Sequence, residues 1–228
     1  MPPKDYHIVI DSEYGYRRLE PLPEDGELAD FYESQYYDLI RKGGRAPELR
    51  RLTAGGQIAE QERTWLKGTL YADIEHILKR HAPGKRVLDV GCGTGELVSF
   101  LTKAGFNTMG IEPSSDAASI AHSLGLKVQK ASLEEFSKYV LENSVQLFDV
   151  VSLLNVLEHV PHPARTIEIS RGIISSSGII CIRVPNDFSE IQEAAREKLG
   201  CAPWWIATPD HINYFDVHSV EGLLKNLG

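Results

Sequence analysis

The chain has 228 residues, of which 42% are hydrophobic, and this size and composition suit one packed domain with an appendage. A formal net charge of −8, from 24 basic and 32 acidic residues, disfavours a nucleic-acid substrate. The cysteines, Cys92, Cys181 and Cys201, are far apart and form no CxxC pair, so the pattern suggests neither a disulfide framework nor a zinc ribbon. No apolar run reaches membrane-spanning length and the first residues lack a signal-peptide core, which predicts a cytoplasmic protein without a membrane span.

Residues 1–57 differ in character from the rest, and we expect them to form an extension to a main domain at 58–228. Apolar residues at near-helical spacing, between a turn cluster at 21–26 and the stop at Gly43-Gly44, predict a short helix. The aromatic side chains of this extension either pack on the main domain or form a lid that excludes water from a site, and both can hold at once. The tyrosines concerned are Tyr6, Tyr14, Tyr16, Tyr32, Tyr36 and Tyr37.

Hydrophobic periodicity organises the remainder of the chain. A 3.6-residue apolar period predicts a helix over 58–81, ended by Ala82-Pro83-Gly84. Alternating strand-like and helical segments follow, which predict an α/β fold with a doubly wound parallel sheet, and a last helix is expected over 218–227. The expected strands are 86–90, 107–111, 126–129, 147–154 and 178–184.

The most informative stretch is a glycine turn within VLDVGCGTGE, at 87–96. An apolar strand leads into Gly91, Gly93 and Gly95, and a helical pattern follows. Glycine lacks Cβ, so the turn can adopt positive φ and let a cofactor lie directly on the main chain. Glu112 ends the next apolar segment, where its carboxylate can accept two hydrogen bonds from a ribose diol. Taken alone, the turn is equally compatible with a purely structural strand-to-helix connection.

Together with Glu112 and the segment FDVVSLLNVLEHV at 148–160, the turn resembles that of class I S-adenosylmethionine-dependent methyltransferases. The resemblance runs from about Tyr71 to the C-terminus, and is closest to a small-molecule branch that includes ubiquinone-pathway and sugar or polysaccharide-biosynthesis enzymes. It implies a Rossmann-like sheet, S-adenosylmethionine as cofactor, S-adenosylhomocysteine as product and a small-molecule acceptor. Domains of this family finish with a β-hairpin. Because the chain stops at Gly228, we expect that hairpin to be missing, either by truncation or by nature.

The resemblance also implies roles for the cofactor-binding residues. Asp89 is expected near the methionine ammonium, or else to bond loop amides, and Cys92 to be a small neutral filler. Ser132 and Leu133 are expected at the adenine, although many relatives carry an aspartate where Ser132 stands. The residues implied are Asp89, Gly91, Cys92, Gly93, Gly95, Glu112, Pro113, Ser132, Leu133, Asn155 and Val156.

No metal is expected. Ubiquinone-pathway relatives often carry an acid where Asn155 stands, which binds a divalent cation together with the acid and histidine that follow. Glu158 and His159 remain here, but Asn155 offers no charged oxygen.

Two histidines are candidates for removing a proton from an acceptor hydroxyl, because imidazole titrates near neutral pH. His159 follows strand four, where the resembled fold presents the methyl group; the alternative is that it only bonds the turn at 161–163. His211 lies in the loop 203–215 beside Asp210, and we favour His211 as the base, with His159 shaping the pocket. Unless that loop is packed only for stability, it also supplies acceptor contacts, for which the candidates are Trp204, Trp205, Asp210, Asn213 and Tyr214.

These features predict methyl transfer to a small molecule, with O-methylation ahead of N- or C-methylation. Two alternatives stay open. One is a catalytically silent methyltransferase-like binding domain, and the other is a nucleotide-cofactor oxidoreductase, against which the GxGxG spacing and the LEHV segment argue. No motif identifies the acceptor or the oligomeric state.

Overall fold

The computed structural model describes residues 5–24, 26–28, 31, 39, 42–43 and 47–228. The chain divides into two compact units, each described here by itself. Unit 1 comprises Met1–Phe31, Leu154–Glu168 and Ile182–Gly228, and unit 2 comprises Tyr32–Leu153 and Ile169–Cys181. The boundary predicted at residue 57 stays a prediction.

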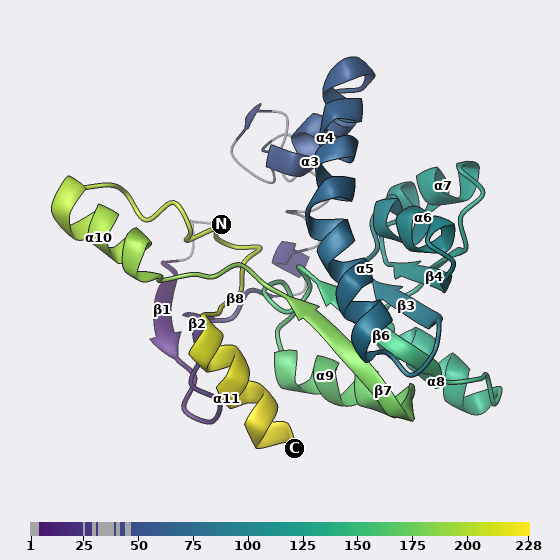
Figure 1. Ribbon diagram of the computed structural model, residues 1–228. Coiled ribbons are helices and arrows are strands. Elements are labelled where there is room, and N and C mark those ends of the chain that lie inside the picture. The colour runs from purple at the N-terminus through teal and green to yellow at the C-terminus, as the bar shows by residue number, and fades with distance from the viewer. Residues whose placement is uncertain (1–4, 25, 29–30, 32–38, 40–41, 44–46) are drawn as a thin grey trace. The chain divides into compact units, whose positions relative to one another are not determined.

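Unit 2 is built on a five-stranded sheet in the order β5-β4-β3-β6-β7, of which Figure 1 labels β4, β3, β6 and β7. Central strand β3 is buried and pairs in parallel with β4 and β6, so that Leu88 lies between Met109 and Val151. Since the second strand of the sheet, β4, and the fourth, β6, flank the first, the order reverses beside β3, as in doubly wound folds. The predicted fold class is therefore confirmed. The strands are β3 (Arg86–Val90), β4 (Asn107–Glu112), β5 (Val128–Lys130), β6 (Phe148–Leu154) and β7 (Ile174–Arg183).

Helices accompany this sheet. Helix α6 contacts β4, and α7 contacts both β4 and β5. Figure 1 shows both helices near β4. The single helix predicted over 58–81 was wrong, because the chain forms two helices that meet at Thr69. Gly68 has low helix propensity and ends the first of them, although the apolar period continues across the break. The helices are α3 (Pro47–Thr53), α4 (Gly56–Gly68), α5 (Leu70–His81), α6 (Glu96–Lys103), α7 (Ser115–Ser123), α8 (Leu133–Glu142) and α9 (Pro163–Gly172).

Unit 1 contains a small antiparallel sheet that the sequence did not predict. Strands β1 (His7–Ile10) and β2 (Arg17–Glu20) form a hairpin, and β2 also pairs with β8 (Asn213–Tyr214). Leu19 of β2 is fully buried, so the hairpin contributes to the core of its unit. Helices α10 (Glu190–Leu199) and α11 (Val217–Leu227) complete unit 1.

Most of the predicted tyrosine-rich helix lies outside the described residues. Tyr32, Tyr36 and Tyr37 lie outside the described residues, as does Gly44, so the helical lid stays a prediction. Tyr16 is buried and its ring lies 5.2 Å from that of Phe215, which supports the packing alternative at that position. Within the described ranges, no helix has both the length and the apolar character needed to cross a bilayer.

Candidate active site

The glycine turn of unit 2 has the backbone conformation expected from its residues. Gly91, Gly93 and Gly95 have φ values of 65°, 55° and 81°. The amides of Gly91 and Cys92 both donate to the Ile111 carbonyl, at 2.9 and 3.1 Å, which holds the turn against the end of β4. Residues other than glycine rarely adopt these dihedral angles, so the turn needs glycine at all three positions.

Two of these glycines face different surroundings. A Cβ added to Gly95 would lie 2.6 Å from Cδ1 of Leu126, so this glycine allows the start of α6 to pack closely. A Cβ added to Gly93 would meet nothing within 4 Å. The main chain at Gly93 is therefore the part of the turn on which a cofactor has room to lie.

Cys92 lies against the main chain of β4. A Cβ on Gly110 would come 2.4 Å from the Cys92 sulfur, so the glycine in β4 makes room for this side chain. Burial raises the pKa of the Cys92 thiol, and the negative charges of Asp89 and Glu112 raise it further. The thiol remains protonated at neutral pH, as expected of a neutral filler.

Glu112 bridges the glycine turn and the start of helix α7. One carboxylate oxygen accepts a hydrogen bond from the Gly93 amide at 2.9 Å, and the other accepts from the Ser114 amide at 2.9 Å. A carboxylate offers about four lone-pair positions, so the side chain keeps capacity to accept from a diol. Pro113, the next residue, is exposed. The arrangement fits the ribose contact that the sequence predicts for Glu112.

Asp89 is the residue before the end of β3, and it is buried, with 4% of its surface exposed. Burial raises its pKa to about 7, an interaction with the Ser152 side chain lowers it, and the nearby charge of Glu112 raises it again. A cation placed beside Asp89 would offset the loss of hydration. The methionine ammonium is a group of that kind.

The expected adenine contacts lie at the start of helix α8. The Ser132 hydroxyl accepts from the Glu135 amide at 3.2 Å, and the Glu135 carboxylate accepts from the Ser132 amide at 2.9 Å. This capping box engages the serine in starting the helix. Leu133 is the first helical residue, whose amide has no acceptor within its own helix, so its main chain is better suited than Ser132 to contact an adenine ring.

Asn155 and Val156, in unit 1, form a tight turn after β6. Asn155 has φ of 54°. Its main-chain amide donates to the Arg183 carbonyl at 2.8 Å, and its side-chain oxygen accepts from the Arg183 guanidinium at 2.6 Å. The Val156 carbonyl accepts from the His159 amide at 3.0 Å. Asparagine tolerates the left-handed region better than most residues, which suits it to this strained position. Contacts of these two residues with a cofactor stay predictions.

The two candidate histidines of unit 1 belong to one cluster. The ring centroids of His159 and His211 are 4.8 Å apart and the rings meet edge to face. Nδ1 of His159 lies 2.9 Å from the carbonyl oxygen of Asp210. A carbonyl can only accept, so this nitrogen carries the hydrogen, and in the neutral ring Nε2 carries the lone pair. That tautomer is the one in which Nε2 can take a proton.

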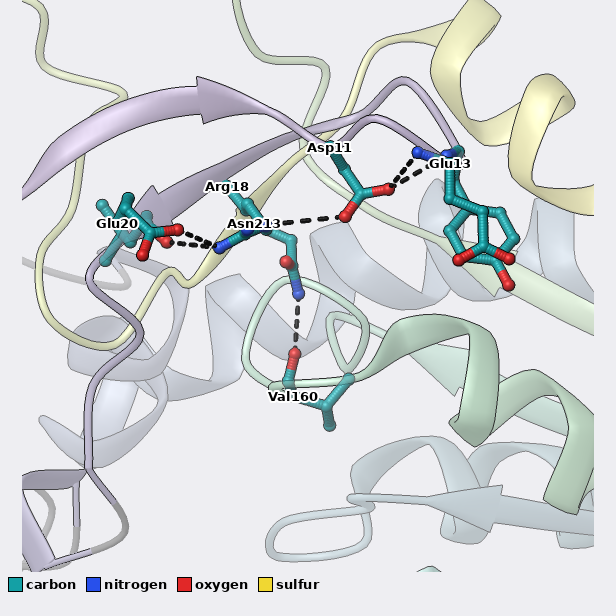
Figure 2. Close-up of polar contacts among 8 residues, drawn as sticks. Asp11, Glu13, Arg18, Glu20, Val160 and Asn213 are labelled. Atoms are coloured by element: carbon teal, nitrogen blue, oxygen red, sulfur yellow. Dashed lines mark hydrogen bonds and ion pairs between the residues drawn. The ribbon is translucent and has the colours of Figure 1, made fainter.

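Asn213 connects the segments that carry the two histidines. Its side-chain Nδ2 donates to the carbonyls of Leu157 at 2.9 Å and Val160 at 2.7 Å, the second of which Figure 2 shows. The side chain is fully buried. The acceptor contact expected from the sequence for Asn213 stays a prediction.

The aromatic residues of the loop 203–215 differ in how far they are exposed. Trp205 is buried against Phe188, with ring centroids 5.8 Å apart, and the buried Tyr214 hydroxyl accepts from the Ala207 amide at 3.3 Å. Trp204 is 58% exposed and is the better placed of the three to meet an acceptor.

Two further acids of unit 1, Glu158 and Asp187, are buried. Burial raises the pKa of Glu158 to about 8; Arg183 lowers it and the charge of Asp187 raises it. Burial also raises the pKa of Asp187 to about 7. Sequence reasoning missed Asp187, which lies in the turn that follows β7. Phe188, the next residue, has φ of 55°, and strained residues of this kind often mark functional sites.

A metal is sterically compatible with the histidine cluster. The ligand atoms of His159, Asp210 and His211 lie within 4.8 Å of one another, and two imidazoles with a carboxylate suit first-row divalent metals. The expectation that no metal is needed stays a prediction.

Comparison with known proteins identifies the family. Residues 62–228 match the family model described as "Methyltransferase domain". The ubiquinone biosynthesis O-methyltransferase of Actinobacillus pleuropneumoniae serotype 7 is 31% identical over 103 residues, 42% of this chain and 44% of the relative. That of Paraburkholderia phymatum is 34% identical over 100 residues, 43% of each chain. The matched region thus spans less than half the length of these relatives.

Solved structures share the fold. Magnesium protoporphyrin IX methyltransferase from Synechocystis PCC 6803 superposes with a TM-score of 0.60 at 16% identity, covering 90% of this chain and 89% of that one. A methyltransferase from Archaeoglobus fulgidus has a TM-score of 0.57 at 19% identity, covering 85% and 74%. With the family model matching well over half of its length, the chain belongs to the methyltransferase domain family.

Proposed function

We propose that this chain transfers the methyl group of S-adenosylmethionine to a hydroxyl group of a small molecule. The observation that carries the proposal is the hydrogen bond from His159 Nδ1 to the Asp210 carbonyl, because it leaves Nε2 as the proton-accepting nitrogen. The names of the curated relatives, which are O-methyltransferases, support oxygen as the acceptor atom.

We assign the cofactor to unit 2. S-adenosylmethionine, when bound, supplies a methyl group already activated on a sulfonium. The open main chain at Gly93 gives the cofactor room, Glu112 accepts from the ribose hydroxyls, and Asp89 compensates the ammonium charge. The solved Synechocystis enzymes carry S-adenosylhomocysteine or S-adenosylmethionine, which supports this assignment.

We assign proton removal to unit 1. Nε2 of His159 would take the proton that an acceptor hydroxyl loses, and the Asp210 carbonyl holds the ring in the required tautomer. His211, edge-on to His159, helps to orient the acceptor. The sequence alone favours His211 as the base, whereas the hydrogen bond to His159 supports the opposite order.

A methyl-transfer assay tests the proposal. The protein is incubated with methyl-labelled S-adenosylmethionine and matched phenolic and amine acceptors, and label transfer is measured beside cofactor binding by calorimetry. Transfer to phenols supports the proposal, and transfer to amines alone contradicts the choice of oxygen. Cofactor binding with no transfer to either class would favour a silent binding domain, and binding of NADH in place of the sulfonium would favour an oxidoreductase.

Replacing Glu112 with alanine is expected to weaken S-adenosylmethionine binding roughly ten- to a hundred-fold. The change removes the charge-assisted hydrogen bonds to the ribose, a net loss of about 1.5–3 kcal/mol. Calorimetric titration measures the affinity. The matched control is Asp116→Ala, an exposed acid in the first turn of α7, which should leave the affinity unchanged. Equal affinity for both variants would contradict the ribose assignment.

The affinity for S-adenosylmethionine is expected to depend on Asp89 ionisation. Below its pKa of about 7 the carboxyl is protonated and must lose a proton to pair with the ammonium, so the affinity should fall about tenfold per unit of pH there. It should level off above pH 7, and decrease again above about pH 8 as an α-amino group titrates. Calorimetry across pH checks this profile, and Asp89→Asn should remove the lower limb.

The ionisation of Asp89 also changes the stability of the folded protein. The folded carboxyl keeps its proton up to about pH 7, whereas its reference value of 3.8 describes the unfolded chain. Its contribution to the stability of the free protein is therefore lost as the pH rises between these values. A lower limb of the binding profile that persists in Asp89→Asn would mean that another group titrates.

A further inference from the structure

The segments that carry the two histidines are joined by several hydrogen bonds within unit 1. The amides of Ile212 and Asn213 both donate to the Glu158 carbonyl, at 2.7 and 3.1 Å. The side chain of Asn213 donates to the carbonyls on either side, those of Leu157 and Val160. One asparagine thus bonds the turn on both flanks of His159, from a position two residues after His211.

Strand β2 in turn holds Asn213 through main-chain pairing. Its main chain pairs with Arg18 of strand β2. In Figure 2 the Arg18 side chain lies between two acids, with its guanidinium 3.5 Å from the Asp11 carboxylate and 2.6 Å from that of Glu20. Asp11 also accepts from the amide of Glu13 at 3.0 Å, which closes the hairpin turn. The hairpin thereby backs the strand from which the Asn213 side chain projects.

From these contacts we propose that Asn213 is a positioning residue, which sets the distance and angle between His159 and His211. The proposal rests on the proposed function, because positioning is useful only if the imidazoles handle the acceptor. It assigns Asn213 no contact with the acceptor or the cofactor. Its two side-chain hydrogens, directed at two carbonyls, are what the role requires.

The chemistry of the position explains why asparagine is needed. Aspartate has the same shape but has no hydrogen to donate, so a carboxylate would face two carbonyl oxygens in a fully buried place. Leucine would leave both carbonyls unbonded. Serine keeps one donor, and its small size avoids overpacking. Asn213→Ser is therefore the mildest change that removes half of the link.

The test combines kinetics with the tautomer of His159. In Asn213→Ser we expect kcat to fall about ten- to a hundred-fold, the size of effect that a small misplacement of reacting groups produces, with S-adenosylmethionine affinity unchanged. Nitrogen NMR of the histidine rings should find His159 with hydrogen on Nδ1 in the unaltered protein, and a mixture of tautomers in the variant. Asn143→Ser, at an exposed asparagine that follows α8 in unit 2, is the matched control and should change neither readout.

A double-mutant comparison separates positioning from general stability. Added to His159→Ala, Asn213→Ser should cause little further loss of kcat, because the ring that it positions is already absent. A further loss as large as that in the unaltered background overturns the proposal, as does a retained tautomer with unchanged kcat. If no methyl transfer is found at all, the proposed function fails, and the NMR comparison still decides whether Asn213 sets the ring.

Discussion

Replacing His159 with alanine is expected to lower kcat by roughly 10²–10⁴, the range that a positioned general base contributes. The physical reason is that a hydroxyl becomes a good nucleophile only as its proton leaves. His211→Ala should show a smaller deficit, since its ring lies beside that of His159 and it is the ring of His159 that donates a hydrogen bond to the Asp210 carbonyl. Turnover with methyl-labelled cofactor measures both variants, and cofactor affinity should stay unchanged in each.

The matched control for these variants is His162→Ala, an exposed histidine three residues further along the chain, which should retain full turnover. A deficit confined to His211→Ala would restore the order favoured from the sequence. Full activity in both variants would mean that the acceptor needs no protein base, as for a nitrogen nucleophile that is already neutral at the working pH.

Replacing Gly93 with valine is expected to abolish S-adenosylmethionine binding while leaving unit 2 folded. The new side chain would project into the space beside the turn, where a Cβ meets nothing within 4 Å. It would therefore occupy the place assigned to the cofactor. Calorimetry measures the binding, and circular dichroism with thermal unfolding measures the fold.

The control for this variant is Gly105→Val. Gly105 also has positive φ, of 89°, with nothing within 4 Å of a built Cβ, so it matches the backbone strain of about 1–2 kcal/mol without touching the turn. Gly105→Val should lose some stability and keep its cofactor affinity. Gly95→Val should instead unfold the turn, because Leu126 occupies the space. If Gly93→Val binds the cofactor normally, the turn is only a structural connection.

The centre of the main sheet could be predicted because strands β3 and β6 are mostly apolar runs. Strand β3 has the predicted bounds, and β6 begins one residue later than expected. Strand β7 begins at Ile174, earlier than the predicted 178, because three serines interrupt the apolar pattern. The break at Thr69 could not be predicted from periodicity, since the apolar stripe continues through it. Helix α10 was missed because none of its residues is buried, so it lacks a core-facing signal.

The two parts of the site differ in how far the sequence predicts them. The cofactor residues lie in contiguous motifs, so that Gly93 and Glu112 can be assigned from local spacing alone. The histidine cluster depends on contacts between residues 51 positions apart, as for His159 and Asp210, and nothing in either segment encodes the pairing. The hydrogen bonds of Asn213 could not be predicted for the same reason, because its two carbonyl partners are remote in sequence.

The sheet formed by β1, β2 and β8 has a consequence for the order in which the protein is made. Strands β1 and β2 are synthesised long before β8, the partner that completes their sheet; Arg17 and Asp216, which form an ion pair beside it, are 199 positions apart. Unit 2 is complete once Cys181 has been added. Its glycine turn can therefore form on the nascent chain while β2 still exposes an unpaired edge, and an unpaired edge of this kind can pair with other chains until β8 is made.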